Sequence, residues 1–521
     1  MRMDRITLEV IGSALLSIAE EMGTALIKAS YSSNIKERWD CSTAIFDREG
    51  QVIAQAEHIP MHLGSLLGII QEILGRYPPE RLAAGDVFAA NDPYSGGGTH
   101  LPDITLASPV FVDGELFGFV ANIAHHADRT GERIRSIYDE GLRITPIRLV
   151  EGGQVREDVM ELLLANFAVP DQRRGDFRAQ IAANRLGERR LVELCGRYGR
   201  ATVKAAADEC LAYGERKIRA AIAQLPPGVY RFTDYLDGDG VKDGPIPVAC
   251  AIAVDGDRIH LDFTGSGPQS PGDINVVWLA LLATVYYALK AILDPTIPAN
   301  GGFYRAIEVE APEGSIVNAR PPAAVGWRTQ TCQRIADVIF GALAPVLPER
   351  VPAAGNGANS AWVFSGVDPR TGRYYVYLET LGGGAGATAR AHGLDGVQVH
   401  ITNTSNLPVE CLEMEYPLLV EEYALVDGSG GAGRFRGGRG IRRTIQVLNH
   451  EAQLLGTLER AEIRPWGLQG GGPGGCGALI LDPGTAEEKR LPSKVWGHPL
   501  KPGDRVQIIT AGGGGWGPPS D

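Results

Sequence analysis

Two β-prone runs joined by Asp113-Gly114 constrain the fold of this chain more than any other feature. The runs read ITLASPVFV and ELFGFVAN. An Asp-Gly pair between such runs is typical of a two-residue turn, which connects neighbouring antiparallel strands. We therefore expect a hairpin in which Val112 faces Glu115, and in which residues about 20 positions apart meet at its open end.

The register of this hairpin places Asp103 opposite Ala124 and His100 opposite Ala127. The nearby candidate ligands on the second strand are His125, His126 and Asp128. Directly opposed residues have β-carbons about 5 Å apart, so side chains from two strands can share one ion. Strand parity favours His126 on the face of Asp103, but Pro102 interrupts the ladder, so either histidine is a candidate.

A second, shorter hairpin is predicted around Asp47-Arg48-Glu49-Gly50, between the runs STAIF and QVIAQA. The same reasoning pairs Asp40 with His58, again at an open end. A single histidine such as His58 or His62 is more often a structural residue than a ligand.

Histidine and aspartate ligands without cysteine suit zinc, manganese, iron or magnesium. A bound divalent ion lowers the pKa of its water from about 16 to about 7 and polarises a carbonyl group. These residues therefore predict a metal-dependent hydrolytic site. The glycines before Thr99 lack the GxxxxGK[ST] pattern of a P-loop, so we read them as tight backbone turns and predict no nucleotide site in this chain.

The chain of 521 residues is too long for a single core, and its periodicity changes along the sequence. A helix of about six turns is expected after Asp4 as N-cap, and a buried helix from Val276 to about Leu293. We expect an α+β, multi-lobed fold with mixed and antiparallel sheets, a helical lobe and a glycine-rich, strand-rich C-terminal region. The predicted regions are an N-terminal metal-site region (1–160), a helical arm (161–225), a central α+β region (226–380) and the C-terminal region (381–521).

Charge and cysteine content narrow the possible partners. The net charge is −12, which argues against nucleic acid or an anionic membrane as a partner, because both need a basic surface. The N-terminus lacks the features of a signal peptide. The seven cysteines show no paired CxxC spacing, so a reducing cytoplasm is the expected location.

Several motifs, spread in order along nearly the whole chain, resemble the hydantoinase B/oxoprolinase family, the β-type subunits of N-methylhydantoinase, 5-oxoprolinase and caprolactamase. They are SSNIKERWDCSTAIFD, HIPMHLGS, NDPYSGGGTHLPD, AHHAD, IPANGGF, EAPEGSIVNARPPAAVGWR, LPVECLE, GGAGRFRGGRG and GGGGWGPP. The resemblance implies a hydantoinase A-type partner subunit with an actin-like ATPase fold, which uses ATP and magnesium to phosphorylate the amide oxygen of a cyclic amide. It also implies a hetero-oligomer, α2β2 or larger, in which the present chain hydrolyses the activated amide.

Carried onto this sequence, the resemblance implies metal ligands at Asp40, His100, Asp103 and His125. It implies that His126 and Asp128 contact the ion or its ligands, and we add both to the catalytic candidates. Arg38 is the third catalytic candidate, because a guanidinium can clamp a phosphate or carboxylate through two hydrogen bonds. The chain reads AHHADRTG where the family often reads AHHADIGG, so substrate choice stays open.

Two other readings stay open. Acetone and acetophenone carboxylases use related subunits, although these tend to be longer. A non-catalytic scaffold for an ATPase is the third reading, and it would need no stoichiometric metal ion.

Overall fold

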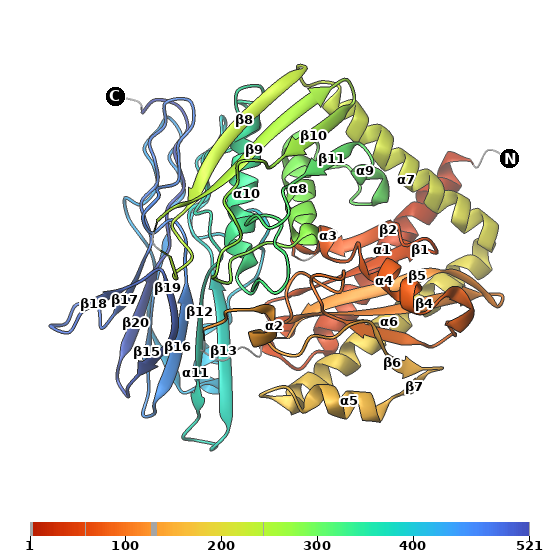
Figure 1. Ribbon diagram of the computed structural model, residues 1–521, viewed down its shortest axis with the longest axis horizontal. Helices are drawn as coiled ribbons and strands as arrows, with labels where there is room; N and C mark the ends of the chain where they lie inside the picture. Colours follow the sequence, from red (N-terminus) through yellow and green to blue (C-terminus); the bar gives the residue numbers. More distant parts are fainter. Residues whose placement is uncertain (1–3, 58, 127–132, 243, 520–521) are drawn as a thin grey trace.

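A computed structural model describes residues 4–57, 59–126, 133–242 and 244–519. Figure 1 shows three packed regions, with the N-terminal sheet and its helices on one side and the C-terminal strands on the other. The predicted α+β class with several antiparallel sheets is confirmed. One sheet contains β12 (Ser360–Val367), β13 (Tyr374–Leu381) and β16 (Ala452–Thr457), and so spans the boundary that we predicted between residues 380 and 381.

The N-terminal region is built on a seven-stranded sheet of order β2-β1-β5-β4-β3-β6-β7. Its strands are β1 (Cys41–Asp47), β2 (Val52–Glu57), β3 (Val87–Ala90), β4 (Asp103–Val112), β5 (Glu115–His125), β6 (Ile147–Glu151) and β7 (Gln154–Val155). Both predicted hairpins are present. Asp113 and Gly114 have φ of 53° and 78°, as a type I′ turn requires.

Helices cover both faces of this sheet (Figure 1). They are α1 (Arg5–Ala29), α2 (Ser33–Lys36), α3 (His62–Ser65), α4 (Ile69–Arg76), α5 (Glu157–Leu164), α6 (Pro170–Tyr198) and α7 (Arg200–Ile222), with 3-10 turns η1 (Pro79–Arg81) and η2 (Ile137–Asp139). Asp4 caps α1 as predicted, since its side chain accepts from the Thr7 amide at 2.9 Å. The face that α1 buries includes Ile11, Leu15, Ile18 and Met22.

Among the described helices, α1 alone is long and apolar enough to cross a membrane by length and composition. The core helix of a soluble protein meets the same criterion. In this structure α1 packs along α6 and against β1 and β2.

In the central region α10 (Arg328–Leu343) packs against a four-stranded sheet of order β11-β10-β9-β8, and α8 (Trp278–Leu293) packs against α10. Its elements are β8 (Gly228–Leu236), β9 (Ile246–Asp255), β10 (Arg258–Asp262), α8 (Trp278–Leu293), α9 (Gly301–Tyr304), β11 (Ile307–Glu310) and α10 (Arg328–Leu343). The predicted buried helix corresponds to α8 and is confirmed. Every residue of α10 is buried, so this helix forms the centre of the molecule.

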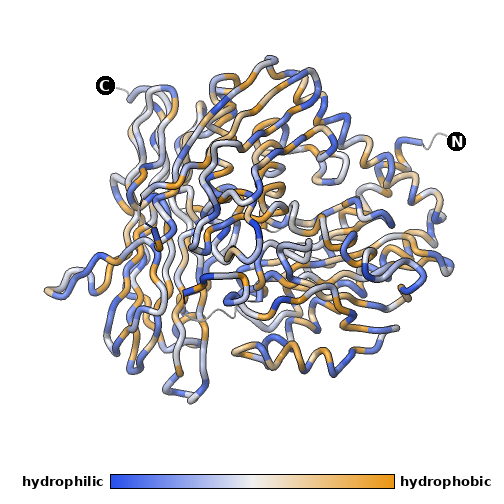
Figure 2. Tube along the Cα trace, in the orientation of Figure 1, coloured by the Kyte–Doolittle hydropathy of each residue, from blue (hydrophilic) through white to orange (hydrophobic). Residues whose placement is uncertain are grey.

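Two sheets face each other in the C-terminal region, in orders β13-β12-β16-β19 and β14-β15-β20-β17-β18. The elements are β12 (Ser360–Val367), β13 (Tyr374–Leu381), α11 (Val409–Glu415), β14 (Leu418–Leu425), β15 (Ile441–Val447), β16 (Ala452–Thr457), β17 (Ala478–Leu481), β18 (Lys489–Leu491), β19 (Lys494–Leu500) and β20 (Arg505–Ile509). Trp362 and Phe364 of the first sheet pack with Ile445 and Ile508 of the second. Apolar and polar residues are interleaved along these strands (Figure 2), as expected where one face is buried.

The glycine clusters near the C-terminus form a separate packed layer, the glycine core, defined as residues 382–386, 429–440, 467–475 and 511–516. Its extended segments hydrogen-bond to one another, for example Gly513 N–H to the Gly438 carbonyl and Gly431 N–H to the Gly513 carbonyl. A β-carbon added at Gly437 would lie 1.8 Å from the Gly513 oxygen. These glycines are therefore explained by chain packing.

Candidate metal centre

The β4–β5 hairpin places His125 directly opposite Asp103. The turn keeps Val112 facing Glu115 as predicted, but the register shifts between Val110 and Phe111. This irregularity moves every later pair by one residue, since a bulge inserts one extra residue into one strand. The predicted pairing of Asp103 with Ala124 is therefore wrong, and His125, not His126, shares the face of Asp103.

His100, Asp103 and His125 form a three-residue group whose possible ligand atoms all lie within 4.8 Å of one another. His100 lies just before β4, and its Nδ1 donates to the Gly326 carbonyl at 3.2 Å. Its Nε2 lies 3.1 Å from Asp103 Oδ1. A ring fixed in this way at Nδ1 is the usual arrangement for a histidine that ligates through Nε2.

Arg328, at the start of α10, and Thr99 hold the other oxygen of Asp103. The Arg328 Nη2 donates to Asp103 Oδ2 at 2.6 Å, and the Thr99 hydroxyl donates to the same oxygen at 3.0 Å. Burial raises the pKa of Asp103, but the charges of His100 and Arg328 outweigh burial and hold it well below its usual range. Asp103 is therefore a carboxylate at neutral pH, with Oδ1 turned toward His100.

Asn34 orients the third member of the group. Its Nδ2 lies 3.0 Å from His125 Nδ1 and donates to the His125 carbonyl at 2.8 Å, while its Oδ1 accepts from Arg38 at 2.7 Å. Burial, with the nearby charge of His100, lowers the pKa of His125 well below its usual value. A neutral imidazole is the form that binds a metal ion.

Asp40 lines the same cavity, but lies outside the three-residue group. Its backbone carbonyl accepts from the His125 amide at 3.0 Å, which joins it to β5. The preceding residue, Trp39, has a φ of 57°, a conformation uncommon for residues other than glycine. Burial and the neighbouring Asp103 raise the pKa of Asp40 to about 6.

His62, which we interpreted as structural, also lines this cavity of about 60 Å³. Its Nδ1 lies 2.9 Å from the Ser42 hydroxyl. Burial lowers the pKa of His62 to about 4, although the Asp103 carboxylate opposes this effect, so its ring is neutral. His58, the predicted partner of Asp40, lies outside the described residues, as does Asp128.

His126 points away from the three-residue group. Its Nε2 donates to Gln180 of α6 at 2.9 Å, and its ring lies 4.9 Å from the ring of Phe177. Adjacent residues of a strand face opposite sides of the sheet, so His126 lies under α6 when His125 faces the cavity. The expectation that His126 would contact the ion or its ligands is not met by this geometry.

The donor set fits a divalent ion. Two imidazoles and a carboxylate are the ligands typical of catalytic zinc and related metals. Ligands about 2.1 Å from one ion lie roughly 3 to 4 Å apart, so the observed spacing requires only small side-chain shifts. Asp40 lines the same cavity.

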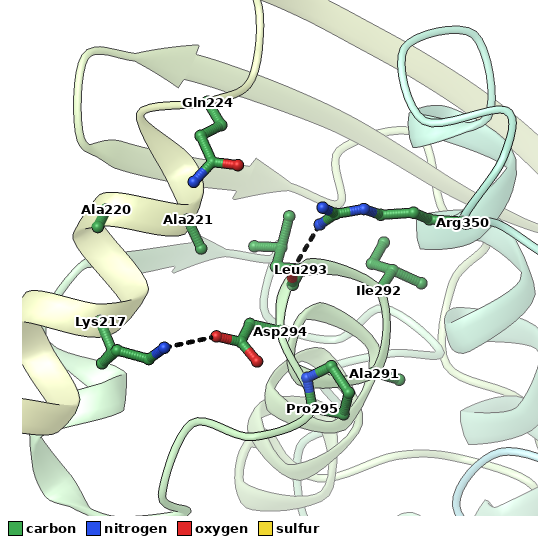
Figure 3. Close-up of a pocket in the computed structure, with 10 residues that line it drawn as sticks. All are labelled: Lys217, Ala220, Ala221, Gln224, Ala291, Ile292, Leu293, Asp294, Pro295 and Arg350. Carbon is green, nitrogen blue, oxygen red and sulfur yellow. Dashed lines mark hydrogen bonds and ion pairs between the residues drawn. The ribbon is translucent and has the colours of Figure 1, made fainter.

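A larger open groove, of about 460 Å³, lies at the C-terminal ends of α7 and α8 (Figure 3). Its charged side chains already have partners, since Lys217 pairs with Asp294 at 3.0 Å and Arg350 donates to the Leu293 carbonyl at 2.7 Å. Among the described residues, His100, Asp103 and His125 form the only group of three candidate ligands. The candidate metal centre therefore lies in the smaller, buried cavity.

The chain belongs to a known class: the sequence model for hydantoinase B/oxoprolinase matches residues 4–519, so the chain is a member of this family. It is 34% identical to the B-type subunit of the putative D-/L-hydantoinase of Pseudomonas sp. strain NS671, covering 99% of the chain and 90% of that relative. It is 36% identical to the 5-oxoprolinase PfmaA of Pestalotiopsis fici, covering 99% of the chain but 41% of that longer protein.

Two solved structures share the fold. The ATP-dependent caprolactamase of Pseudomonas jessenii superposes with a TM-score of 0.91 at 32% identity, covering 99% of this chain and 92% of that one. An acetone carboxylase structure superposes with a TM-score of 0.89 at 19% identity, covering 99% of this chain and 76% of that one. The second likeness shows the fold alone.

Proposed function

We propose that this chain is the metal-dependent hydrolytic subunit of an ATP-dependent cyclic amidase. The substrate is a hydantoin, 5-oxoproline or a related lactam that a hydantoinase A-type partner subunit first phosphorylates. The observation that carries the proposal is the three-residue group of His100, Asp103 and His125 in a buried cavity. The names of the similar proteins, a B-type hydantoinase subunit, a 5-oxoprolinase and an ATP-dependent caprolactamase, support the reaction class.

The residues of the cavity have distinct roles in this proposal. His100, Asp103 and His125 hold a divalent ion, and Asp40 completes the ligand set. Arg328 and Thr99 hold Asp103 in its ionised form, while Gly326 and Asn34 orient the two imidazoles. When bound, such an ion supplies an activated water molecule and polarises a carbonyl group.

The division of labour between two subunits has a physical reason. An unstrained amide is a poor electrophile, and phosphorylation of its oxygen makes the carbonyl carbon easier to attack. The ATPase partner would supply this activation, and the present chain would bind and orient the activated amide beside the ion. Because two subunits share the reaction, we propose that they form a hetero-oligomer. Because the reaction consumes ATP, we propose that this hetero-oligomer is cytoplasmic.

The test combines metal analysis with a panel of cyclic amides. The purified chain is expected to contain about one divalent ion per site, and, with its ATPase partner, to hydrolyse at least one amide of the panel. The His100→Ala variant should lose both the ion and ATP-dependent turnover. His260→Ala, which removes a histidine of β10 whose side chain is 39% exposed, should retain both.

Two outcomes would point elsewhere. Bicarbonate-dependent ATP turnover with a ketone would favour a carboxylase subunit, the class of the second structural relative. Full activity in protein stripped of its ion would favour a scaffold for the ATPase.

A further inference from the structure

Six arginines are buried in the described chain, and five of them contact a carboxylate within 4.0 Å. The five paired residues are Arg173, Arg328, Arg334, Arg443 and Arg460. The sixth, Arg38, is 2% exposed and has no carboxylate within that distance among the described residues. A buried charge without a counterion is costly, so its position calls for an explanation.

Arg38 lines the cavity of the metal centre, and not all of its hydrogen-bond donors are used. Its Nη1 donates to the Asn34 side chain and to the Leu378 carbonyl, and its Nη2 donates to the Thr380 hydroxyl at 3.0 Å. Its Nε is buried without a partner in the described chain. Neutral oxygens hold the side chain in place, and no carboxylate of the described chain contacts it directly.

The charge of the cavity also favours an anion. Its two arginines, Arg38 and Arg328, balance its two carboxylates, Asp40 and Asp103. A divalent ion held by the proposed ligands would leave an excess of two positive charges in a buried space. A negatively charged ligand would remove that excess, and an oxyanion matches the fork of a guanidinium.

We propose that Arg38 binds an oxyanion that enters the cavity with the substrate. The inference rests on the proposed function, and it adds the chemical class of the group that this part of the cavity receives. Two sources carry the same chemistry: the phosphoryl group of the activated amide, or a carboxylate on the substrate itself. Arg38 is placed to contact either.

Inorganic phosphate and acetate, titrated by calorimetry into the full chain with and without its ion, test the proposal. Arg38→Gln removes the charge but keeps an amide donor for Leu378 or Thr380. Arg350→Gln removes one positive charge from the remote groove of Figure 3 and serves as the matched control. Loss of a charge-assisted hydrogen bond should weaken anion binding about tenfold or more in Arg38→Gln, and Arg350→Gln should bind like the wild type.

Each result bears on the proposal. Phosphate binding that is tighter than acetate binding would identify the phosphoryl group as the anion that Arg38 contacts. Acetate binding that is tighter than phosphate binding would identify a substrate carboxylate. Equal affinity in wild type and Arg38→Gln, or no anion binding by the wild type, would overturn the role of Arg38. If Arg38→Gln does not fold, Arg38→Lys replaces it, with a loss of about threefold or more expected because an ammonium lacks the planar fork; unchanged affinity there overturns the role equally.

Metal content measured on the same samples separates the two proposals. A chain that binds its ion but shows no effect of Arg38 contradicts this inference alone. A chain that binds no ion contradicts the proposed function.

Discussion

At the scale of single residues, Asp103 has a different partner for each carboxylate oxygen. Oδ2 accepts from Arg328 and Thr99, and Oδ1 faces His100. At Asp40, burial and the neighbouring Asp103 outweigh the charges of Arg38 and Arg328 and raise the pKa to about 6. The two carboxylates of the cavity therefore differ in how readily each gives up its proton.

This difference predicts a pH-dependent metal affinity. Asp40 must lose its proton before it can bind an ion, so affinity should rise as the pH increases through about 6. Calorimetry at pH 5 in buffers of different ionisation enthalpy should detect release of about one proton from Asp40, and much less at pH 7.5. The Asp40→Asn variant should lose this release, and an unchanged release there would contradict the assignment.

His126 should make the protein sensitive to acid. Burial lowers its pKa from 6.5 to about 4. Between pH 6.5 and 4, His126 is therefore protonated in the unfolded chain but not in the folded chain. The contribution of His126 to the free energy of unfolding is fully present above pH 6.5. It is lost as the pH falls toward 4, by up to about 3 kcal/mol. Chemical denaturation at several pH values should show a shallower loss in His126→Gln than in wild type.

The exposed His260 provides the control for this measurement, since His260→Gln should leave the pH profile unchanged. Identical profiles for wild type and His126→Gln would contradict the predicted contribution. His62 shifts in the same direction, so part of the acid sensitivity should remain in the variant.

Residue types alone located part of the site. Histidine and aspartate in NDPYSGGGTHLPD and AHHAD, with the Asp113-Gly114 turn, were enough to predict that two strands share the ligands. The choice between His125 and His126 depended on a bulge, which leaves no clear signal in PVFVDGELFG. Arg328 and Asn34 come from distant segments, so their contacts with the ligands required tertiary structure.

At the scale of elements, the sequence predicted those helices and turns that are determined by interactions between residues close together in the chain. The hairpin turn, the cap of α1 and the apolar helix α8 follow from residues within a few positions of each other. The glycine core could not be predicted in this way, because its close contacts join segments as distant as Ala385 and Gly513. The sequence shows the many glycines, but it does not show which segments of the chain they bring into contact.

The glycine core predicts a large effect for a small substitution. In Gly437→Ala the new methyl group would overlap the Gly513 carbonyl, and no flexible side chain can move to relieve the clash. We expect a loss of more than about 4 kcal/mol in unfolding free energy, or failure to fold. Gly75→Ala, in α4, meets nothing within 4 Å and should change stability by about 1 kcal/mol or less; comparable losses in both variants would contradict the packing argument.

At the scale of the whole molecule, α10 connects the metal centre to the C-terminal region. Its first residue, Arg328, contacts Asp103, and further along the helix Arg334 pairs with Asp234 of β8 and Glu459 beyond β16. Arg460 bridges Asp234 and Asp337 at 2.8 and 2.7 Å. Removing one member of such a buried network leaves an uncompensated charge, so the regions are expected to unfold together.

The proposed division of labour predicts that activity belongs to the assembly. The purified chain should show little hydrolysis of any cyclic amide, and the rate should rise strongly when the ATPase partner and ATP are added together. Omitting ATP is the matched control. Full hydrolysis by the chain alone would contradict the need for an activated substrate.

The position of β20 within its sheet bears on how the molecule is made. This strand lies between β15 and β17, and Gly512–Gly515 pass through the middle of the glycine core. Both segments are synthesised after almost all of the residues that they contact. The C-terminal layers therefore cannot close until β20 and Gly512–Gly515 have been made. Until then β15 and β17 each have an open edge, and this is the period in which a chaperone would have most to protect.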